Sequence, residues 1–192
     1  MNFEFIILDF IQAHFRCEFL DFLVPKISAL GNRGILWIVF TLILLMMKKT
    51  RKYGLYSAIS LILMLTVCNL GLKPLIARMR PFTHNTAVTL LIPPPSDYSF
   101  PSGHTMAGFA TSVAYLMCHL SRKNAKEKTF FDSAAMVVIM FAVAAIIAFT
   151  RLYLYVHYPT DVLGAIILGN VDGIVSAKIA EKIIHTKNLK IE

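Results

Sequence analysis

The sequence predicts an all-α fold, an integral membrane bundle of five to six transmembrane helices with an interfacial helix at the N-terminus. The first observation behind this prediction is composition: 57% of the residues are hydrophobic and only 16% are charged, whereas a soluble domain carries about 25% charged residues. The second is that basic residues stand in short clusters between apolar runs, which is typical of membrane topology. The net charge of +8 therefore indicates a bilayer and not a nucleic acid as the partner.

Five apolar stretches are long enough, or nearly so, to cross a bilayer, which takes about 20 mostly apolar residues. The first is short unless it includes turns from the residues before it. The second is interrupted only by Asn69 and Lys73. The five stretches comprise residues 34–47, 53–76, 102–120, 132–150 and 159 to about 177.

Residues 1–30 are rich in aromatic side chains but are interrupted by six charged ones, so they predict an amphipathic segment of one or two interfacial helices, with an additional span as the alternative. The acidic start lacks the basic region of a cleavable signal peptide. Residues 31–185 then form a single membrane domain, and residues 186–192 a cytoplasmic tail. The charged residues are Glu4, Asp9, Arg16, Glu18, Asp21 and Lys26.

The basic clusters predict the orientation. Residues 48–52 and 121–128 each contain four lysines or arginines, and further lysines follow Ala177. With five spans after residue 30, all three clusters fall on one face, which the positive-inside rule makes cytoplasmic. We therefore expect a multi-pass protein of the plasma or cell inner membrane, with residues 77–101 and 151–158 outside the cytoplasm.

Lys73, Arg80 and Arg151 collect at the opposite face from these clusters. Lys73 and Arg80 are seven positions apart in the sequence, close to two helical turns, so a continuous helix would project them from one side. Arg78 would face another way, and we interpret it as an interfacial anchor. Isolated cations at helix ends are commonly anchors, but three converging cations are suited to binding a phosphate or a similar oxyanion.

Residues 101–104 read Pro-Ser-Gly-His before an apolar run. Ser102 is a natural N-cap, Gly103 permits close approach to the backbone, and the helix N-terminus attracts anions. His104 would lie in the first turn, aimed at the same place. An ordinary helix cap is the alternative interpretation.

His157 and Asp161 are four positions apart, with Pro159 as a first-turn residue of the last helix. A carboxylate at this spacing can bind one imidazole nitrogen and raise the basicity of the other, which is the arrangement of a nucleophilic histidine. A structural pair, or a zinc site formed with His104, are the alternatives, although the surrounding cations disfavour a metal ion.

Three separated motifs together resemble the signature of the type 2 phosphatidic acid phosphatase family, the membrane lipid phosphatases related to vanadium haloperoxidases. They read KPLIARMRP (73–81), PSGH (101–104) and TRLYLYVHYPTD (150–161). The similarity covers roughly residues 30–180. One position departs from the pattern, because Thr150 stands where the family usually has serine.

The resemblance implies a phosphatase that needs no metal or other cofactor. His157 would be the nucleophile that forms a phosphohistidine, Asp161 would orient it, and His104 would protonate the leaving oxygen as general acid. The remaining site residues would bind the phosphate. These are Lys73, Arg80, Ser102, Gly103 and Arg151.

The small size and the loop over residues 80–105 resemble the bacterial subgroup that acts on undecaprenyl diphosphate, so we expect hydrolysis of that lipid to undecaprenyl phosphate. Phosphatidic acid and phosphatidylglycerophosphate are alternative substrates. A vanadate-dependent haloperoxidase and a non-enzymatic membrane protein are more remote alternatives, the first disfavoured by the lipid-length spans and the second by the histidines and aspartate of the motifs.

Overall fold

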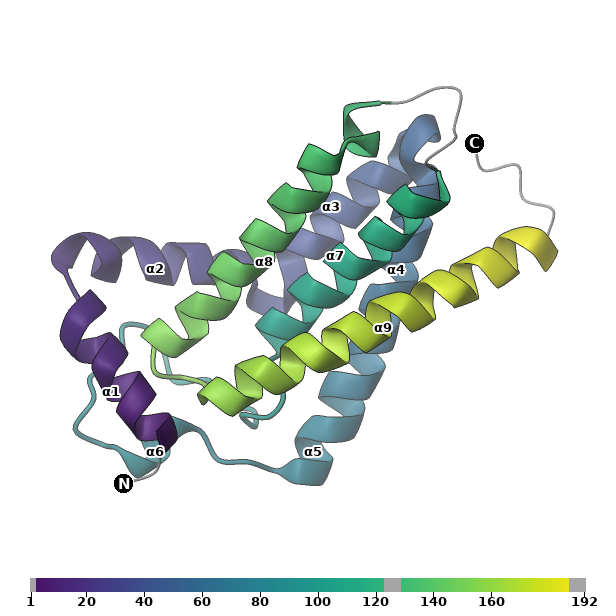
Figure 1. The fold of residues 1–192 in the computed structure, drawn as a ribbon. Coiled ribbons are helices and arrows are strands. Elements are labelled where there is room, and N and C mark those ends of the chain that lie inside the picture. Colours follow the sequence, from purple (N-terminus) through teal and green to yellow (C-terminus); the bar gives the residue numbers. More distant parts are fainter. Residues whose placement is uncertain (1–2, 123–128, 187–192) are drawn as a thin grey trace.

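The computed structural model describes residues 3–122 and 129–186, and every regular element in these ranges is a helix (Figure 1). The all-α prediction is confirmed there. Residues 187–192 of the expected tail, and most of the basic cluster at 121–128, lie outside the described residues.

Each of the five predicted spans corresponds to an observed helix with similar bounds. The second is continuous through three elements, because α4 passes directly into a π-helix and then into α5. The last continues past its expected end near residue 177. The observed elements are α3 (Ile35–Met46), α4 (Arg51–Met64) with the π-helix Leu65–Leu72 and α5 (Lys73–Ile76), α7 (Gly103–Ser121), α8 (Ala134–Tyr153) and α9 (Pro159–Thr186).

The number of helices that could cross a membrane is smaller than the predicted five to six. In the part of the chain that the structure describes, three helical stretches are long and apolar enough, comprising Lys48–His84, α8 and α9. A fourth is obtained if α2 (Glu18–Leu30) and α3, which are bent by 45°, count as one span. The helix α7 is not among them. It packs against α4, α8 and α9, so most of its surface meets protein and does not require a continuous apolar face.

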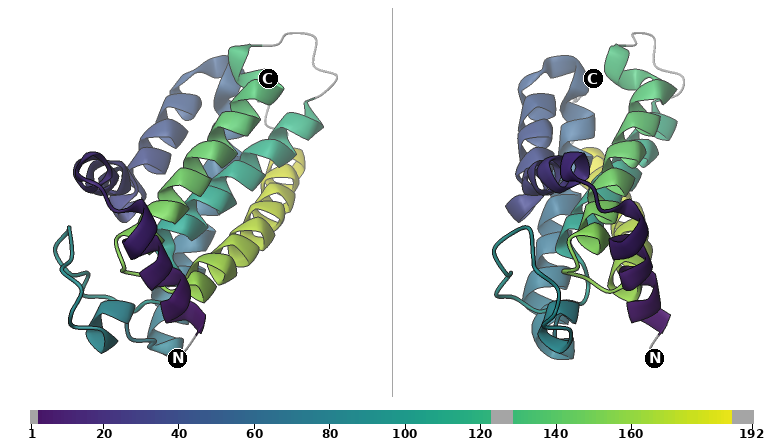
Figure 2. Two further views of the ribbon diagram at one scale, coloured as in Figure 1. Left: turned by 60° about the vertical axis from the view of Figure 1, so that its left-hand side comes forward. Right: turned by 90° about the vertical axis from the view of Figure 1, so that its left-hand side faces the viewer.

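The N-terminal segment forms two helices, α1 (Phe3–Phe15) and α2, and α2 lies across the direction of the bundle (Figure 2). Two acidic side chains fix them to the end of α8: the Tyr155 hydroxyl donates to Asp9 at 2.8 Å, and the Tyr153 hydroxyl to Asp21 at 2.6 Å. The outward faces of α1 and α2 are aromatic, which suits a membrane interface. Their exposed phenylalanines are Phe3, Phe10, Phe15, Phe19 and Phe22.

The close packing of α7 against α9 determines where the motifs lie. At Gly173 an added Cβ would come within 2.6 Å of the Val113 side chain, 2.7 Å of the Ala110 carbonyl oxygen and 2.8 Å of the Ala114 nitrogen. Only glycine permits such an approach of two backbones. It brings the N-terminal ends of α7 and α9 together at the lower end of the bundle in Figure 1, where α5 and α8 also end.

We expect Gly173→Ala to lower the free energy of unfolding by about 1–3 kcal/mol, because backbone atoms of α7 cannot yield to the added methyl group. The change is measurable as a fall in melting temperature in detergent, followed by fluorescence of the single buried tryptophan, Trp37. Gly71→Ala is the matched control, since its nearest neighbour would lie at 3.4 Å. An unchanged melting temperature for Gly173→Ala would contradict this account of the packing.

Candidate active site

Lys73 and Arg80 converge by a route that the sequence did not predict. The helix that carries Lys73 ends at Ile76, and Ala77 turns the chain with a left-handed φ of 48°. Arg80 follows in extended backbone, with φ −80° and ψ 154°. The two residues therefore do not share a helical face, and the argument from helical spacing was wrong. Their side chains meet because both contact the carboxylate of Asp97.

A cavity of about 430 Å³ lies where these elements end. Two of the eight predicted site residues, Ser102 and Asp161, are absent from its lining and are fully buried. The other six line it together, from the three separate motifs of the chain. They are Lys73, Arg80, Gly103, His104, Arg151 and His157.

His157 lies between a cation and a carboxylate. Its Nε2 is 3.2 Å from Nη1 of Arg80, and because a guanidinium only donates hydrogen bonds, Nε2 is the accepting nitrogen and Nδ1 carries the proton. Nδ1 faces Oδ2 of Asp161 at 3.5 Å. Burial first, and then the charges of Arg80 and Arg151, lower the pKa of His157 well below its usual 6.5. The imidazole is therefore neutral at physiological pH, as a nucleophile must be.

Asp161 is completely buried, and three groups stabilise its charge. The backbone N–H of Tyr158 donates to Oδ2 at 2.8 Å, the Ser99 hydroxyl donates to the same oxygen, and Arg78 donates to Oδ1 at 2.6 Å. The Ser99 oxygen also lies 3.5 Å from Nδ1 of His157. The contact between the histidine and the aspartate is thus long, and Ser99 lies beside both groups.

Arg78 does not act as an interfacial anchor, contrary to our interpretation of the sequence. Besides Asp161 it binds Glu4 of α1 at 2.6 Å, and its guanidinium stacks over the Tyr158 ring at 4.0 Å. Arg78 lies inside the first motif, which could have indicated a role at the site. The arginine links the N-terminal helix to the carboxylate behind His157.

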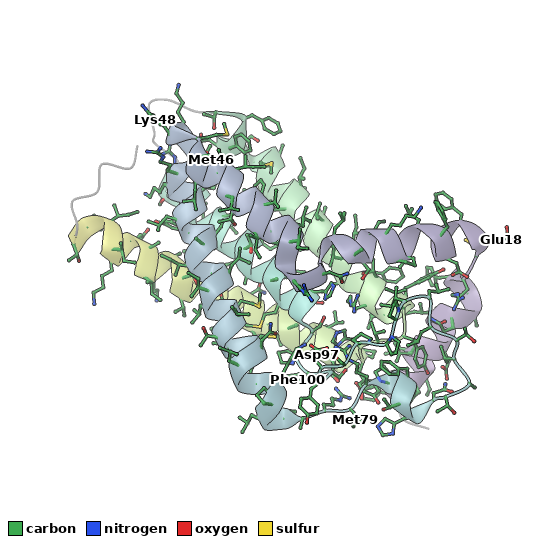
Figure 3. The ribbon with its side chains drawn as sticks, turned by 180° about the vertical axis from the view of Figure 1, so that it is seen from behind. Glu18, Met46, Lys48, Met79, Asp97 and Phe100 are labelled. Carbon is green, nitrogen blue, oxygen red and sulfur yellow. The ribbon has the colours of Figure 1, made fainter. Side chains whose placement is uncertain are left out.

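Asp97 is a site residue that sequence reasoning missed. It pairs with Lys73, and it accepts from Nη2 of Arg80 at 2.7 Å. Burial alone would raise the pKa of Asp97, but Lys73 and Arg80 hold it at about 2. Figure 3 shows Asp97 beneath the corner between α2 and α3, on the loop that leads to Phe100. An acidic side chain four positions before the Pro-Ser-Gly-His motif was the available signal.

Arg151 carries an unsatisfied donor in this pocket. Its Nη1 donates to the Ser28 hydroxyl, whereas its buried Nε has no hydrogen-bond partner among the described residues. A buried N–H without a partner costs about 1–3 kcal/mol. The arginine is therefore available to an oxygen acceptor that enters the cavity.

His104 and Ser102 differ in their access to the cavity. Nε2 of His104 lies 3.1 Å from Oδ1 of Asn32 at the cavity wall. Ser102 occupies the predicted N-cap position, but its side chain makes no capping bond and accepts from the Thr105 hydroxyl at 3.0 Å. Thr150, the position outside the family pattern, is also buried and donates to the Ile147 carbonyl at 2.6 Å.

No group of three or more His, Cys, Asp or Glu side chains within residues 3–122 and 129–186 is arranged to hold a metal ion. The two site carboxylates face cations instead, since Asp97 binds Lys73 and Arg80, and Asp161 binds Arg78. The arrangement is suited to a polyanionic ligand.

Comparison with known proteins agrees with this geometry. Residues 49–184 match the family model of the PAP2 superfamily. The chain is 30% identical over 139 residues to an undecaprenyl-diphosphatase of Sulfolobus acidocaldarius, covering 72% of this chain and 61% of that protein. It is 32% identical over 125 residues to the undecaprenyl-diphosphatase BcrC of Bacillus subtilis, covering 65% and 56%.

Among solved structures, the chain is similar to a transmembrane PAP2-type phosphatidylglycerolphosphate phosphatase from Bacillus subtilis. The TM-score is 0.71 at 26% identity, over 94% of this chain and 85% of that one. The chain spans about 60% of the length of the curated relatives it matches. The match over most of the chain, and the convergence of the three motifs on one cavity, show that this integral membrane protein belongs to the PAP2 superfamily.

Proposed function

We propose that the protein is a lipid phosphatase that transfers a phosphoryl group to His157 and then to water. The observation that carries the proposal is the buried Nε of Arg151, which has no hydrogen-bond partner within residues 3–122 and 129–186. Arg151 lines one cavity with Lys73, Arg80 and the neutral His157. Phosphoryl transfer is catalysed mainly by positioning and by stabilising charge on the equatorial oxygens. Three cations around a nucleophile supply both.

In the first step Nε2 of His157 attacks phosphorus, and the bond from phosphorus to the leaving oxygen breaks. The electron pair stays on that oxygen, which takes a proton from His104. The proton on Nδ1 remains directed at Asp161, which stabilises the positive charge that the ring acquires. Water then attacks the phosphohistidine and gives a proton back to His104, the P–N bond breaks with its electron pair returning to Nε2, and inorganic phosphate leaves. Phosphate oxygens that bind Lys73 and Arg80 compete with the Asp97 carboxylate for the same donors.

The proposed substrate is undecaprenyl diphosphate, with phosphatidylglycerophosphate or phosphatidic acid as the alternative. The names of the relatives from Sulfolobus acidocaldarius and Bacillus subtilis support the first, and that of the structural neighbour supports the second. In this proposal the site residues bind the phosphate of the lipid, and no cofactor takes part.

The site would face outside the cytoplasm. The cavity lies at the opposite end of the bundle from the basic residues 48–52, and Figure 3 shows Lys48 at one end and Asp97 toward the other. By the positive-inside rule the basic end is cytoplasmic. With α7 counted as a central span enclosed by its neighbours, α4, α7, α8 and α9 cross the membrane, together with the bent pair of α2 and α3.

The substrate assignment predicts that kcat/KM for undecaprenyl diphosphate exceeds that for phosphatidate and for phosphatidylglycerophosphate. Phosphate release from the three lipids in detergent, with excess EDTA present, measures this. A higher kcat/KM for either glycerolipid would overturn the assignment. Activity that EDTA removes and zinc restores would favour a metal-dependent site instead.

If His157 is the nucleophile, His157→Ala abolishes phosphate release, because the variant lacks the Nε2 atom that forms the bond to phosphorus. His84→Ala is the matched control, since His84 is exposed and does not line the cavity. The two variants should elute alike in size-exclusion chromatography, with full activity in the control. Retention of more than a few per cent of wild-type activity by His157→Ala would refute the assignment.

A further inference from the structure

A second cavity, of about 310 Å³, adjoins the one that contains His157. Four residues line both cavities and so form the boundary between them, whereas His157, Arg80 and Arg151 line only the first. The second cavity opens at the corner between α2 and α3, beneath which Asp97 lies in Figure 3. The boundary residues are Lys73, Asp97, Gly103 and His104.

The lining of the second cavity combines a cation and an amide with an apolar wall. Besides the boundary residues, Arg33 and Asn69 supply polar groups, and Met64, Leu65 and Ala107 supply apolar ones. Asn69 lies close to the start of α7, because its Oδ1 would be 3.7 Å from a Cβ on Gly103. The cavity can therefore receive a group that is anionic at one end and apolar at the other.

Arg33 has no hydrogen-bond or ion-pair partner in the described part of the chain, although it adjoins a site in which Lys73, Arg80 and Arg78 are all paired. Its side chain is exposed, and its φ of 52° lies in the left-handed region, which is uncommon for a residue other than glycine. A cation in this position is available to a ligand.

The first step of the proposed reaction determines where the leaving group must lie. The scissile bond must lie between Nε2 of His157, which attacks phosphorus, and His104, which protonates the departing oxygen. His104 stands on the boundary between the cavities. The part of the substrate that departs therefore extends past His104 and into the second cavity.

We propose that the second cavity is the subsite for the inner phosphate of a lipid diphosphate, bound by Arg33 and Asn69, with the first carbons of the lipid chain against Met64 and Leu65. This inference rests on the proposed function. In the balanced reaction the bond from the outer phosphorus to the bridging oxygen breaks, and the bridging oxygen remains on the inner phosphate with its electron pair. The lipid monophosphate is then released from the second cavity.

A lipid monophosphate places a neutral alcohol in this subsite instead. Diacylglycerol, which phosphatidate would release, carries no charge for Arg33 to bind. Arg33 is thus a specificity residue that favours diphosphates over monophosphates, and it takes no part in the bond-breaking step.

The test compares two non-hydrolysable ligands that share a tail, farnesyl methylenediphosphonate and farnesyl phosphonate, by calorimetry with the full-length protein in detergent. We expect the wild-type protein to bind the diphosphonate more tightly. Arg33→Gln should reduce the ratio of the two affinities about tenfold, the size of one charge-assisted hydrogen bond. Arg33→Gly should reduce it similarly, and because glycine suits the left-handed backbone, its effect cannot be attributed to misfolding.

Lys26→Gln is the matched control, since Lys26 is an exposed cation on α2 that lines neither cavity. This variant should keep the wild-type ratio. An unchanged ratio in both Arg33 variants, or equal binding of the two ligands by the wild-type protein, would overturn the subsite. Either result would be compatible with phosphatase activity. A wild-type protein that releases no phosphate from any of the lipids would instead overturn the proposed function itself.

Discussion

Positive charge accumulates in one buried pocket, and the surrounding contacts serve to balance it. Lys73, Arg80 and Arg151 are all less than a tenth exposed and line the same cavity. Buried like charges repel strongly in a medium of low dielectric constant. Asp97 offsets two of them and is held ionised by them, with its pKa at about 2. Among the described residues Arg151 has no carboxylate partner, which leaves its charge available to an anionic ligand.

A second set of charges lies behind the first and holds His157 in place. Asp161 is positioned by Ser99, Arg78 and the backbone of Tyr158, and Arg78 is held in turn by Glu4. The N-terminal helix is therefore part of the support of the site, in addition to its exposed aromatic face. This support reaches His157 only because the tight contact of α9 with α7 fixes the start of each helix.

Much of the fold and of the site could be predicted from the sequence, because the helices and the motifs are both visible as local patterns. Apolar runs located the five long helices, and the motifs identified six residues that line the cavity. The prediction that Lys73 and Arg80 share a helical face was wrong, since the helix ends at Ile76 and Ala77 turns the chain. The roles of Asp97, Ser99 and Glu4 depend on contacts between segments far apart in sequence, which periodicity does not show. The predicted number of spans exceeds the number of helices that are long and apolar enough to cross a membrane. The helix α7 accounts for part of the difference, because it is enclosed by protein and does not need to be as apolar as a lipid-facing helix.

Trapping of the covalent intermediate shows whether His157 receives the phosphoryl group. The protein is mixed with undecaprenyl diphosphate labelled with ³²P in its outer phosphate, quenched in base within milliseconds, digested and analysed by mass spectrometry. We expect a label that is stable in base and labile in acid, on the peptide that contains His157. A label on any other residue, or phosphate release with no labelled protein at any time point, would contradict it.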